Sequence, residues 1–267
     1  MTVLVETAQG DRVLSVLDLW RLRTATLAEV DAAAALQTRV DRKYLVPAEV
    51  AQTLVGELAG SHHVLSVKGR VSTSYASTYF DLPGFQSYRA HVQGRRRRWK
   101  VRTRLYVEDG LCRLELKTKD NRGQTVKVAH TQPAPAFGTF TQSGRGFLAD
   151  RLASEALAVP VGELRPGVRI DYARATLCDL DGGTRVTVDG GLVASLRGRV
   201  VRISPHHVLV ETKGGLRPAP ADLLLLRHGV RPTSVSKYGV TLSMLEPGLP
   251  ASPWRRLARR HFCVDPV

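Results

Sequence analysis

Two consecutive stretches decide the fold of this chain: Arg98-Trp-Lys-Val-Arg-Thr-Arg-Leu-Tyr106 and Leu111-Cys-Arg-Leu-Glu-Leu-Lys-Thr-Lys119. In both, charged side chains alternate with apolar ones, and a period of two is typical of a β-strand with one buried face. The intervening Asp109-Gly110 is a turn signal. The sequence therefore predicts an antiparallel hairpin over residues 96–119.

The predicted hairpin carries its charges on one face. The shared positions hold the following residues: Arg96, Arg98, Lys100, Arg102, Arg104, Arg113, Glu115, Lys117 and Lys119. A solvated sheet face above an apolar core is the simplest interpretation of such a pattern. Like charges this dense destabilise a sheet unless an anion neutralises them, which favours an anion-binding surface.

The rest of the chain adds strands and helices around this hairpin. Further strands are expected at 39–46, 71–80, 125–130, 168–177, 185–188, 191–203 in two pieces, and 207–213. Helices are expected at 26–36, 48–58, 85–92, 145–157, 220–228 and 234–245, and a loop at 131–144. About eight strands with helices between them predict a mainly β, α+β fold: an antiparallel barrel or sandwich with flanking helices.

Composition limits the possible partners. The 267 residues carry a net charge of +15, and only eight of the 39 basic residues are lysines. Nucleic acid, an anionic membrane and polyphosphate are therefore the candidate polyanions. Nucleic acid is the least favoured, because aromatics make up 6% of the chain and do not alternate with the basic positions.

Several classes of protein are disfavoured. No apolar stretch approaches the ~20 residues of a membrane span, and no glycine-rich phosphate loop or kinase signature occurs. Three scattered cysteines argue against a disulfide framework or zinc site and, with an amino terminus unlike a secretory signal, predict a cytoplasmic protein. The histidines His62, His63, His91, His206 and His207 lie in or beside predicted turns, where we expect them to face solvent.

A second carboxylate accompanies the basic residues. In the predicted strand 207–213, Leu209, Glu211 and Lys213 share one face, so Glu211 would face a basic interior together with Glu115. A divalent cation bound to phosphate oxygens needs carboxylates of this kind.

The order of motifs resembles the VTC domain, the polyphosphate polymerase branch of the triphosphate tunnel metalloenzyme (CYTH-like) superfamily. The resemblance rests on seven short motifs spread over residues 39–245. They are Arg42-Lys-Tyr-Leu-Val46, Thr78-Tyr-Phe-Asp81, Arg98-Trp-Lys-Val-Arg-Thr-Arg104 with Tyr106, Leu114-Glu-Leu-Lys-Thr-Lys119, Arg169-Ile-Asp-Tyr-Ala-Arg174, Val210-Glu-Thr-Lys213 and Ser236-Lys-Tyr238. Each motif is weak alone, and their order makes the set specific.

The resemblance implies an eight-stranded antiparallel tunnel lined by basic residues for phosphates and acidic residues for Mn²⁺ or Mg²⁺. By motif position, the catalytic phosphate ligands would be Lys43, Arg102, Arg104, Lys117, Lys127, Arg174 and Lys237. Arg98, Lys100, Lys119 and Lys213 would add binding contacts, Glu211 would hold the metal with Glu115 as a helper, and Tyr106 would pack. The resemblance also divides the chain into a helical lead-in (1–38), a tunnel domain (39–246) and a basic tail (247–267).

Two questions about the predicted tunnel are left open by the sequence. Strict alternation puts Arg174 on the face of Ile170 and Tyr172, so either a bulge turns it inward or Arg169 and Asp171 face the tunnel instead. The sequence also leaves open whether the leading helix plugs the tunnel or packs outside it.

The implied activity is transfer of the terminal phosphoryl group of a nucleoside triphosphate to a polyphosphate chain. Hydrolases and cyclases of the superfamily carry Glu-x-Glu-x-Lys on the first strand, where this chain has Arg39-Val-Asp-Arg-Lys43. That departure favours the polymerase. Hydrolysis of tripolyphosphate or nucleoside triphosphates in the same tunnel remains an alternative, as does a polyanion-binding protein without catalysis that uses Arg95–Arg98 and the tail.

Overall fold

The computed structural model describes residues 13–34, 40–119 and 125–265. Within these ranges, eight strands pair side by side along one path, starting at β2. In order they are β2 (Val40–Pro47), β11 (His207–Gly214), β9 (Thr184–Leu196), β8 (Arg165–Asp179), β4 (Ser72–Asp81), β5 (Arg98–Tyr106), β6 (Leu111–Lys119) and β7 (Thr125–Gln132). All seven pairings are antiparallel, as the sequence predicts.

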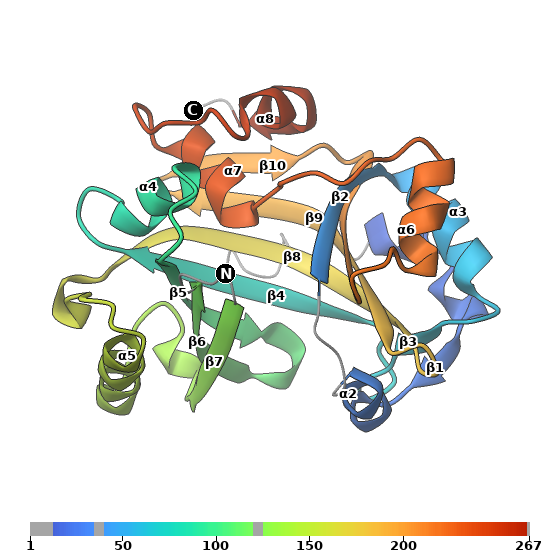
Figure 1. Cartoon of the computed structure of the whole chain (residues 1–267), viewed down its shortest axis with the longest axis horizontal. Coiled ribbons are helices and arrows are strands. Elements are labelled where there is room, and N and C mark those ends of the chain that lie inside the picture. Colours follow the sequence, from blue (N-terminus) through green and yellow to red (C-terminus); the bar gives the residue numbers. More distant parts are fainter. Residues whose placement is uncertain (1–12, 35–39, 120–124, 266–267) are drawn as a thin grey trace.

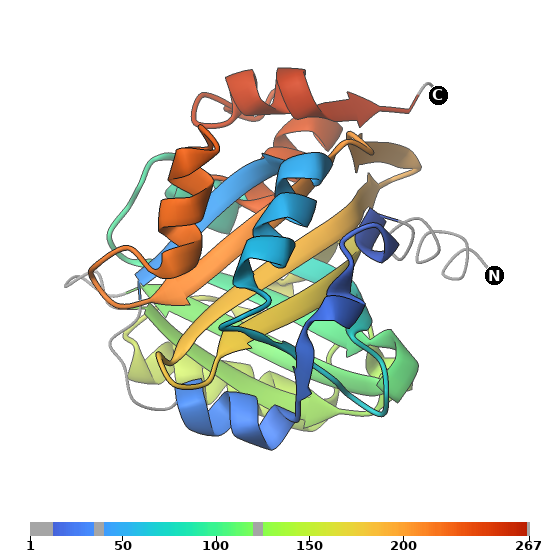
Figure 2. The same cartoon turned by 90° about the vertical axis from the view of Figure 1, so that its right-hand side faces the viewer.

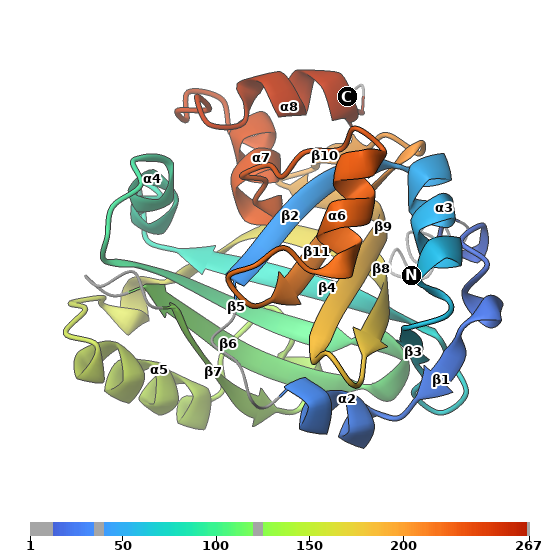
Figure 3. The same cartoon turned by 45° about the vertical axis from the view of Figure 1, so that its right-hand side comes forward.

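The eight strands curve around a central axis without closing (Figure 3). Within the described ranges, no pairing joins the end strands β2 and β7. Short strands extend the sheet: β1 (Arg23–Ala25) runs parallel to β3 (His63–Leu65), which pairs with β8, while β10 (Arg199–Ile203) joins β9 to β12 (Phe262–Val264). The mainly β prediction is confirmed as an open, tunnel-like barrel.

Helices cover the curved sheet. They are α2 (Leu27–Ala34), α3 (Ala48–Leu58), α4 (Gln86–Val92), α5 (Gln142–Ser154), α6 (Pro220–Arg227), α7 (Lys237–Leu245) and α8 (Arg255–His261), with 3-10 turns at Leu19–Arg21, Val107–Asp109, Ala134–Ala136 and Val161–Glu163. Figure 1 shows α7 and α8 over β10, α3 and α6 at the opposite end of the sheet, and α5 beside β7. In the described part of the chain, no helix is long and apolar enough to cross a membrane.

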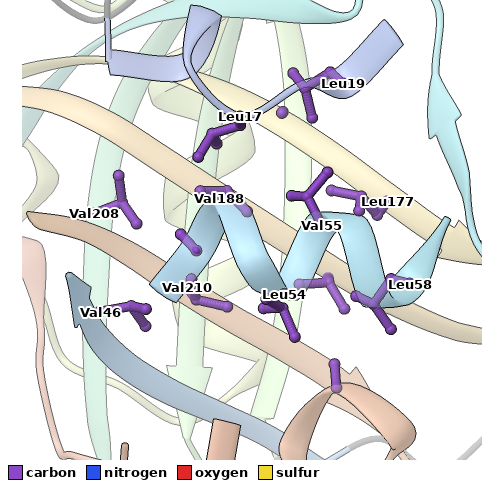
Figure 4. Close-up of a cluster of buried hydrophobic side chains, with 14 of the residues drawn as sticks. Leu17, Leu19, Val46, Leu54, Val55, Leu58, Leu177, Val188, Val208 and Val210 are labelled. Carbon is purple, nitrogen blue, oxygen red and sulfur yellow. The ribbon is translucent and has the colours of Figure 1, made fainter. Parts of the chain in front are cut away.

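The convex face of the sheet is apolar where α3 covers it. The view in Figure 2 looks onto this face, with α3 and α6 lying across the strands. Leu54, Val55 and Leu58 of α3 pack on Val188 of β9 and Val210 of β11 in one buried cluster (Figure 4). Because alternate strand residues enter this core, their neighbours must face the concave side.

The predicted elements agree with the observed ones, with instructive exceptions at their ends. Helix α3 and strand β6 have the predicted bounds. Helix α5 begins at Gln142, inside the predicted loop, because the Thr141 hydroxyl caps it by accepting from the Gly144 amide at 3.0 Å. The predicted turn at 121–123 and the predicted strand start at Arg39 lie outside the described residues.

Strand β9 corrects the predicted break after Val188. It continues through Asp189-Gly-Gly191, where Gly191 has φ of 60°. Asp171 and Ala173 of β8 pair with Val193 and Gly190, so β9 holds one extra residue between them. This bulge turns the strand so that it pairs with β11 before the glycines and with β10 after them.

The position of this bulge also explains which face of β8 carries Arg174. The extra residue belongs to β9, so β8 alternates without interruption from Ile170 to Arg174, and Arg174 shares a face with Tyr172 and Ile170. That face is the concave one, and the expectation that a bulge must turn Arg174 inward was wrong. The concave surface is polar near Arg174 and becomes apolar around Ile170, where α7 packs against it. Arg169 and Asp171 pair with each other on the other face, at 2.9 Å.

The expectation of solvent-facing histidines was also wrong in part. His62 is fully buried beneath the end of α3, while His206 is exposed as expected. Turn residues become buried when a later segment covers the turn, which a local pattern does not show.

Candidate functional site

The concave face encloses one continuous cavity of about 530 Å³. All of the predicted phosphate and metal ligands line it, together with two of the four additional cations. These lining residues are Lys43, Lys100, Arg102, Arg104, Glu115, Lys117, Lys127, Arg174, Glu211, Lys213 and Lys237. They come from β2, β5, β6, β7, β8, β11 and the first turn of α7, so only the folded barrel brings them together.

Arg98 and Lys119, the remaining predicted binding residues, do not line the cavity. They pair with each other across the end of the β5–β6 hairpin. The Arg98 guanidinium turns back and donates to the carbonyl oxygen of Arg95 at 2.5 Å. They therefore lie at the end of the hairpin opposite its turn, outside the cavity lining.

The first charged cluster surrounds Glu115, whose side chain is 3% exposed. Arg102 donates to its Oε2 through Nε at 2.6 Å, and Lys127 Nζ lies 2.7 Å from Oε1. Burial alone would raise the pKa of this carboxyl, but the neighbouring cations Arg102, Arg104 and Lys127 hold the pKa below its usual value. Glu115 is therefore an ionised counter-charge that orients two cations.

The second cluster surrounds Asp189, a residue that the sequence prediction missed. Its carboxylate accepts from Arg174 Nε at 2.5 Å and Nη2 at 2.8 Å, and it also pairs with Lys237. Despite its burial, these two cations lower the pKa of Asp189. The alternation Arg185-Val-Thr-Val-Asp189 could have revealed it, because the polar residues share a face, but the following glycines suggested a strand end.

The third cluster contains Glu211, the predicted metal ligand. Lys213 Nζ lies 2.5 Å from Glu211 Oε1 and 3.3 Å from Asp41 Oδ1. Lys43 pairs with Glu211 across the β2–β11 ladder. Although burial opposes it, the pKa of Glu211 is lowered by Lys213, Lys43 and Arg174, so this carboxylate is ionised.

These carboxylates suit a divalent cation only if water and substrate supply most of its ligands. Among the described residues, no group of three or more acidic, histidine or cysteine side chains could hold a metal ion. Mg²⁺ commonly takes one or two protein carboxylates and completes its shell with water and substrate phosphate oxygens. Glu211 suits that arrangement, whereas Glu115 is already engaged by two cations.

Tyrosine rings lie behind the arginines and fix their planes. Arg104 lies 4.9 Å from the Tyr75 ring centroid and donates to the Tyr172 hydroxyl at 2.8 Å. The rings of Tyr75 and Tyr172 stack with their centroids 5.3 Å apart. Arg102 similarly donates to the Tyr79 hydroxyl at 2.8 Å. The cation–π contacts hold the guanidinium groups in place before any anion arrives.

Lys100 is a buried cation that lies among other cations in the cavity. Burial, followed by the charges of Lys43 and Lys117, lowers its pKa well below the usual value. Its Nζ lies 3.1 Å from His91 Nε2 and donates to Ser236 Oγ at 3.3 Å. A phosphate oxygen would relieve the repulsion among these three lysines.

Asp81 positions the helices that close this end of the barrel. Its carboxylate accepts from the backbone amides of Ser87 and Tyr88 in α4, both at 2.9 Å, and from the Tyr238 hydroxyl of α7 at 2.7 Å. The motifs containing Asp81 and Tyr238 are thus joined by a buried hydrogen bond. This bond places Ser236 and Lys237 at the cavity wall.

With this geometry in place, comparison with known protein families is informative. The VTC domain model matches residues 38–246. The chain belongs to the VTC domain family. A search of curated proteins finds no significant match. The match covers all eight strands of the barrel and α7, but not the leading helix α2.

Solved structures of similar shape include two putative adenylate cyclases. One from Bacillus halodurans is 15% identical with a TM-score of 0.48, and the alignment covers 75% of this chain and 94% of that chain. One from Hippeastrum, described as having a dominant triphosphatase activity, is 17% identical with a TM-score of 0.48 and coverages of 81% and 100%. Because these TM-scores are below 0.5, the family assignment rests on the sequence match.

Proposed function

We propose that this VTC domain is a polyphosphate polymerase. It would bind a nucleoside triphosphate in the tunnel and transfer the terminal phosphoryl group to a polyphosphate chain. The observation that carries the proposal is the single cavity whose wall gathers Lys and Arg side chains from strands around the barrel. A linear polyanion that passes through such a tunnel meets cations on all sides.

Phosphoryl transfer demands little covalent chemistry from the protein. The transition state is loose, so catalysis consists of holding donor and acceptor in line and stabilising charge on the transferred group. Arg102, Arg104 and Arg174, held by carboxylates and tyrosines, are preorganised for this purpose. An acceptor phosphate is already ionised, so the reaction requires no general base.

A metal ion, Mn²⁺ or Mg²⁺, would complete the site by neutralising phosphate charge, and Glu211 would hold it. The protein's own part is to keep Glu211 ionised, which Lys213 and Lys43 do.

One observation favours the polymerase over the hydrolase of the same tunnel. Asp41 is the acid that remains on the first strand, and it does not line the cavity. Its Oδ1 lies 3.3 Å from Lys213 Nζ. A site that relies on first-strand acids for a metal-activated water would lack its ligands here.

The test is incubation with ATP and Mn²⁺, with and without a short polyphosphate primer, resolving polymer from free phosphate on a gel. We expect polymer from the wild-type protein and at least a hundredfold less from Lys117→Ala and Glu211→Gln, since charge stabilisation by a single group is worth about that much. Arg227→Ala and Glu163→Gln, which alter an exposed arginine and an exposed glutamate outside the cavity lining, are controls that should retain activity. Free phosphate without polymer would identify a hydrolase, and binding without turnover would identify a polyanion-binding protein.

A further inference from the structure

Two segments outside the family match of residues 38–246 reach the tunnel. Helix α2 does so directly: Leu27, Val30 and Asp31 line the cavity without filling it, so the leading helix does not plug the tunnel. In the described part of the C-terminal segment, no residue lines the cavity, but Trp254 is buried, with 3% of its surface exposed. Its ring packs against a side chain that contacts the cavity wall. Trp254 is therefore placed to act on the tunnel from outside the matched region.

Three tunnel lysines, Lys43, Lys100 and Lys117, have no counter-ion. Among the described residues, none of the three forms a salt bridge with a carboxylate, whereas Lys127 and Lys237 each do. Lys100 lies directly across the β5–β6 ladder from Lys117, and the charge of Lys43 also acts on it. Because no carboxylate holds the Lys100 amine, its direction must be fixed by neutral groups.

Two neutral side chains hold that amine. Lys100 Nζ lies 3.1 Å from His91 Nε2 and donates to Ser236 Oγ at 3.3 Å. Burial, together with the charges of Lys100, Arg98, Lys43 and Lys117, keeps the pKa of His91 low, so its ring is neutral. A lysine ammonium has three donors and no acceptor, so Nε2 must accept. His91 and Ser236 thus occupy two of the donors, and one remains for the cavity that Lys100 lines.

Trp254 fixes the His91 ring from the other side. The two rings stack with their centroids 5.4 Å apart and an interplanar angle of 26°. Trp254 is itself held in place: its Nε1 donates to the carbonyl oxygen of Ser234 at 3.1 Å, and a Cβ at Gly239 would overlap its ring. His91 Nδ1 is buried without a hydrogen-bond partner in the described ranges. The orientation of His91 therefore depends on the stacked indole and on the contact with Lys100.

We propose that His91 is a positioning residue of the phosphate site and that Trp254 completes it by holding the His91 ring. His91 directs the Lys100 ammonium into the cavity beside Lys43 and Lys117, so a phosphate group meets three cations whose places are set in advance. The C-terminal segment that carries Trp254 is thereby part of the phosphate site, although it lies outside the family match. The proposal rests on the proposed function only in taking the tunnel as a binding site for linked phosphates.

Calorimetric titration with tripolyphosphate tests the role of His91. In His91→Leu the acceptor for Lys100 is lost, and we expect binding to weaken roughly tenfold, since a hydrogen bond to a charged group contributes about that much. His91→Gln can place a carbonyl oxygen where Nε2 lies and should retain the wild-type affinity. Rescue by glutamine and not by leucine would identify the acceptor as the feature that matters.

Trp254→Leu removes the stacked ring and should also weaken binding, by less than His91→Leu because the acceptor remains. Phe262→Leu is the matched control. It removes another buried aromatic ring from the same segment, and Phe262 pairs with Ile203 of β10. This control should bind tripolyphosphate as the wild type does. Wild-type affinity in Trp254→Leu would overturn the role of Trp254.

A double-mutant cycle shows whether His91 acts through Lys100. In a Lys100→Met background, His91→Leu should cause no further loss of affinity, because the side chain that it positions no longer carries a charge. An equal loss in both backgrounds would assign His91 to the general stability of the wall and overturn the proposal. Unchanged or tighter binding by His91→Leu would overturn it as well, and the cycle decides even if Trp254→Leu does not fold.

The two levels of inference fail in different ways. If the wild-type protein does not bind tripolyphosphate, the tunnel is not a phosphate site, and the proposed function falls together with the role of His91. If the wild type binds it and the His91 variants bind it equally well, only the positioning role is overturned. Because binding is measured without turnover, neither result depends on whether the protein makes polymer.

Discussion

The Asp189 carboxylate, only 1% exposed, holds two phosphate-binding candidates, Arg174 and Lys237, at the tunnel wall. Its role resembles that of Glu115, which holds Arg102 and Lys127. Each carboxylate orients two neighbouring cations. Its negative charge also reduces the repulsion between them. The free energy of the empty tunnel therefore depends on a few buried ion pairs rather than on the total charge.

Replacement of Asp189 should show how much its ion pairs contribute to the stability of the folded protein. In Asp189→Asn, two buried cations lose their counter-charge, and removing one partner of a buried pair costs about 3–5 kcal/mol. We expect denaturant unfolding to show a loss of that size, and tripolyphosphate to raise the unfolding temperature more in the variant than in the wild type. Asp150→Asn on the exposed side of α5 is the control. A variant as stable as the wild type would show that Asp189 does not hold these cations.

His91 should give stability a dependence on pH. Burial, then the charges of Lys100 and Arg98, lowers its pKa to about 3, whereas an unfolded histidine has a pKa of about 6.5. As the pH falls below 6.5, His91 becomes protonated in the unfolded state but stays neutral in the folded state, so the free energy of unfolding decreases. At pH 5.5 the loss from this residue is about 1.4 kcal/mol relative to pH 7.5.

His91→Gln keeps an acceptor for Lys100 but cannot titrate. Urea unfolding at pH 7.5 and 5.5 should therefore show a smaller pH effect in the variant, by about that amount. Because the other histidines titrate in both proteins, the comparison isolates His91. An identical pH effect in the two proteins would show that folding does not lower the pKa of His91.

Among the elements, β9 decides the shape of the barrel. Before its bulge, Arg185, Thr187 and Asp189 face the cavity. After it, Leu192 and Ala194 occupy the concave face and pack against α7. One extra residue thus converts a polar wall into an apolar one and lets the strand change partners from β11 to β10.

Gly191 makes this bulge possible, because its φ of 60° is unfavourable for any residue with a Cβ. Gly191→Ala should destabilise the protein by about 1–2 kcal/mol, measured by denaturant unfolding. Gly56→Ala is the matched control: this glycine lies exposed in α3, and a Cβ there meets nothing within 4 Å. The control should be stabilised by about 0.5–1 kcal/mol. A stability gain in both variants would argue against the bulge.

For the whole molecule, the question is where the net charge of +15 acts. Buried carboxylates partly neutralise the cavity cations, while α8 carries Arg255, Arg256, Arg259 and Arg260 on its exposed face. A polyanion could therefore meet cations in the tunnel or on the surface. The tunnel offers cations on several walls at once, which favours it for a chain of phosphates.

Thermal unfolding with tripolyphosphate distinguishes the two locations. A ligand at 100 times its Kd stabilises the folded state by about 2.7 kcal/mol, so we expect a clear rise in unfolding temperature for the wild type. The rise should persist in Arg255→Ala/Arg259→Ala and be largely lost in Arg104→Ala. Loss of the rise in the α8 variant alone would place binding on the surface.

Much of this molecule could be predicted from local patterns. The alternation of charged and apolar residues in 98–119 predicted the hairpin and its basic face, because side-chain direction in a strand follows from backbone geometry alone. The order of short motifs predicted the VTC family, and all the predicted site residues except Arg98 and Lys119 line one cavity. Arg98 and Lys119 lie outside the cavity because they are at the end of the hairpin. Alternation predicts which face of a strand a side chain occupies, but not how far along the tunnel it lies.

The sequence by itself determined the eight principal strands apart from the break placed in β9, the basic face of the hairpin, and the family to which the chain belongs. Only the tertiary structure decided that Asp189 joins Arg174 to Lys237, that Tyr172 faces inward, and that α2 forms one end of the tunnel. These outcomes depend on contacts between segments far apart in the chain. Burial, ion pairing and the direction of a bulged strand arise when such segments meet, so no local pattern contains them.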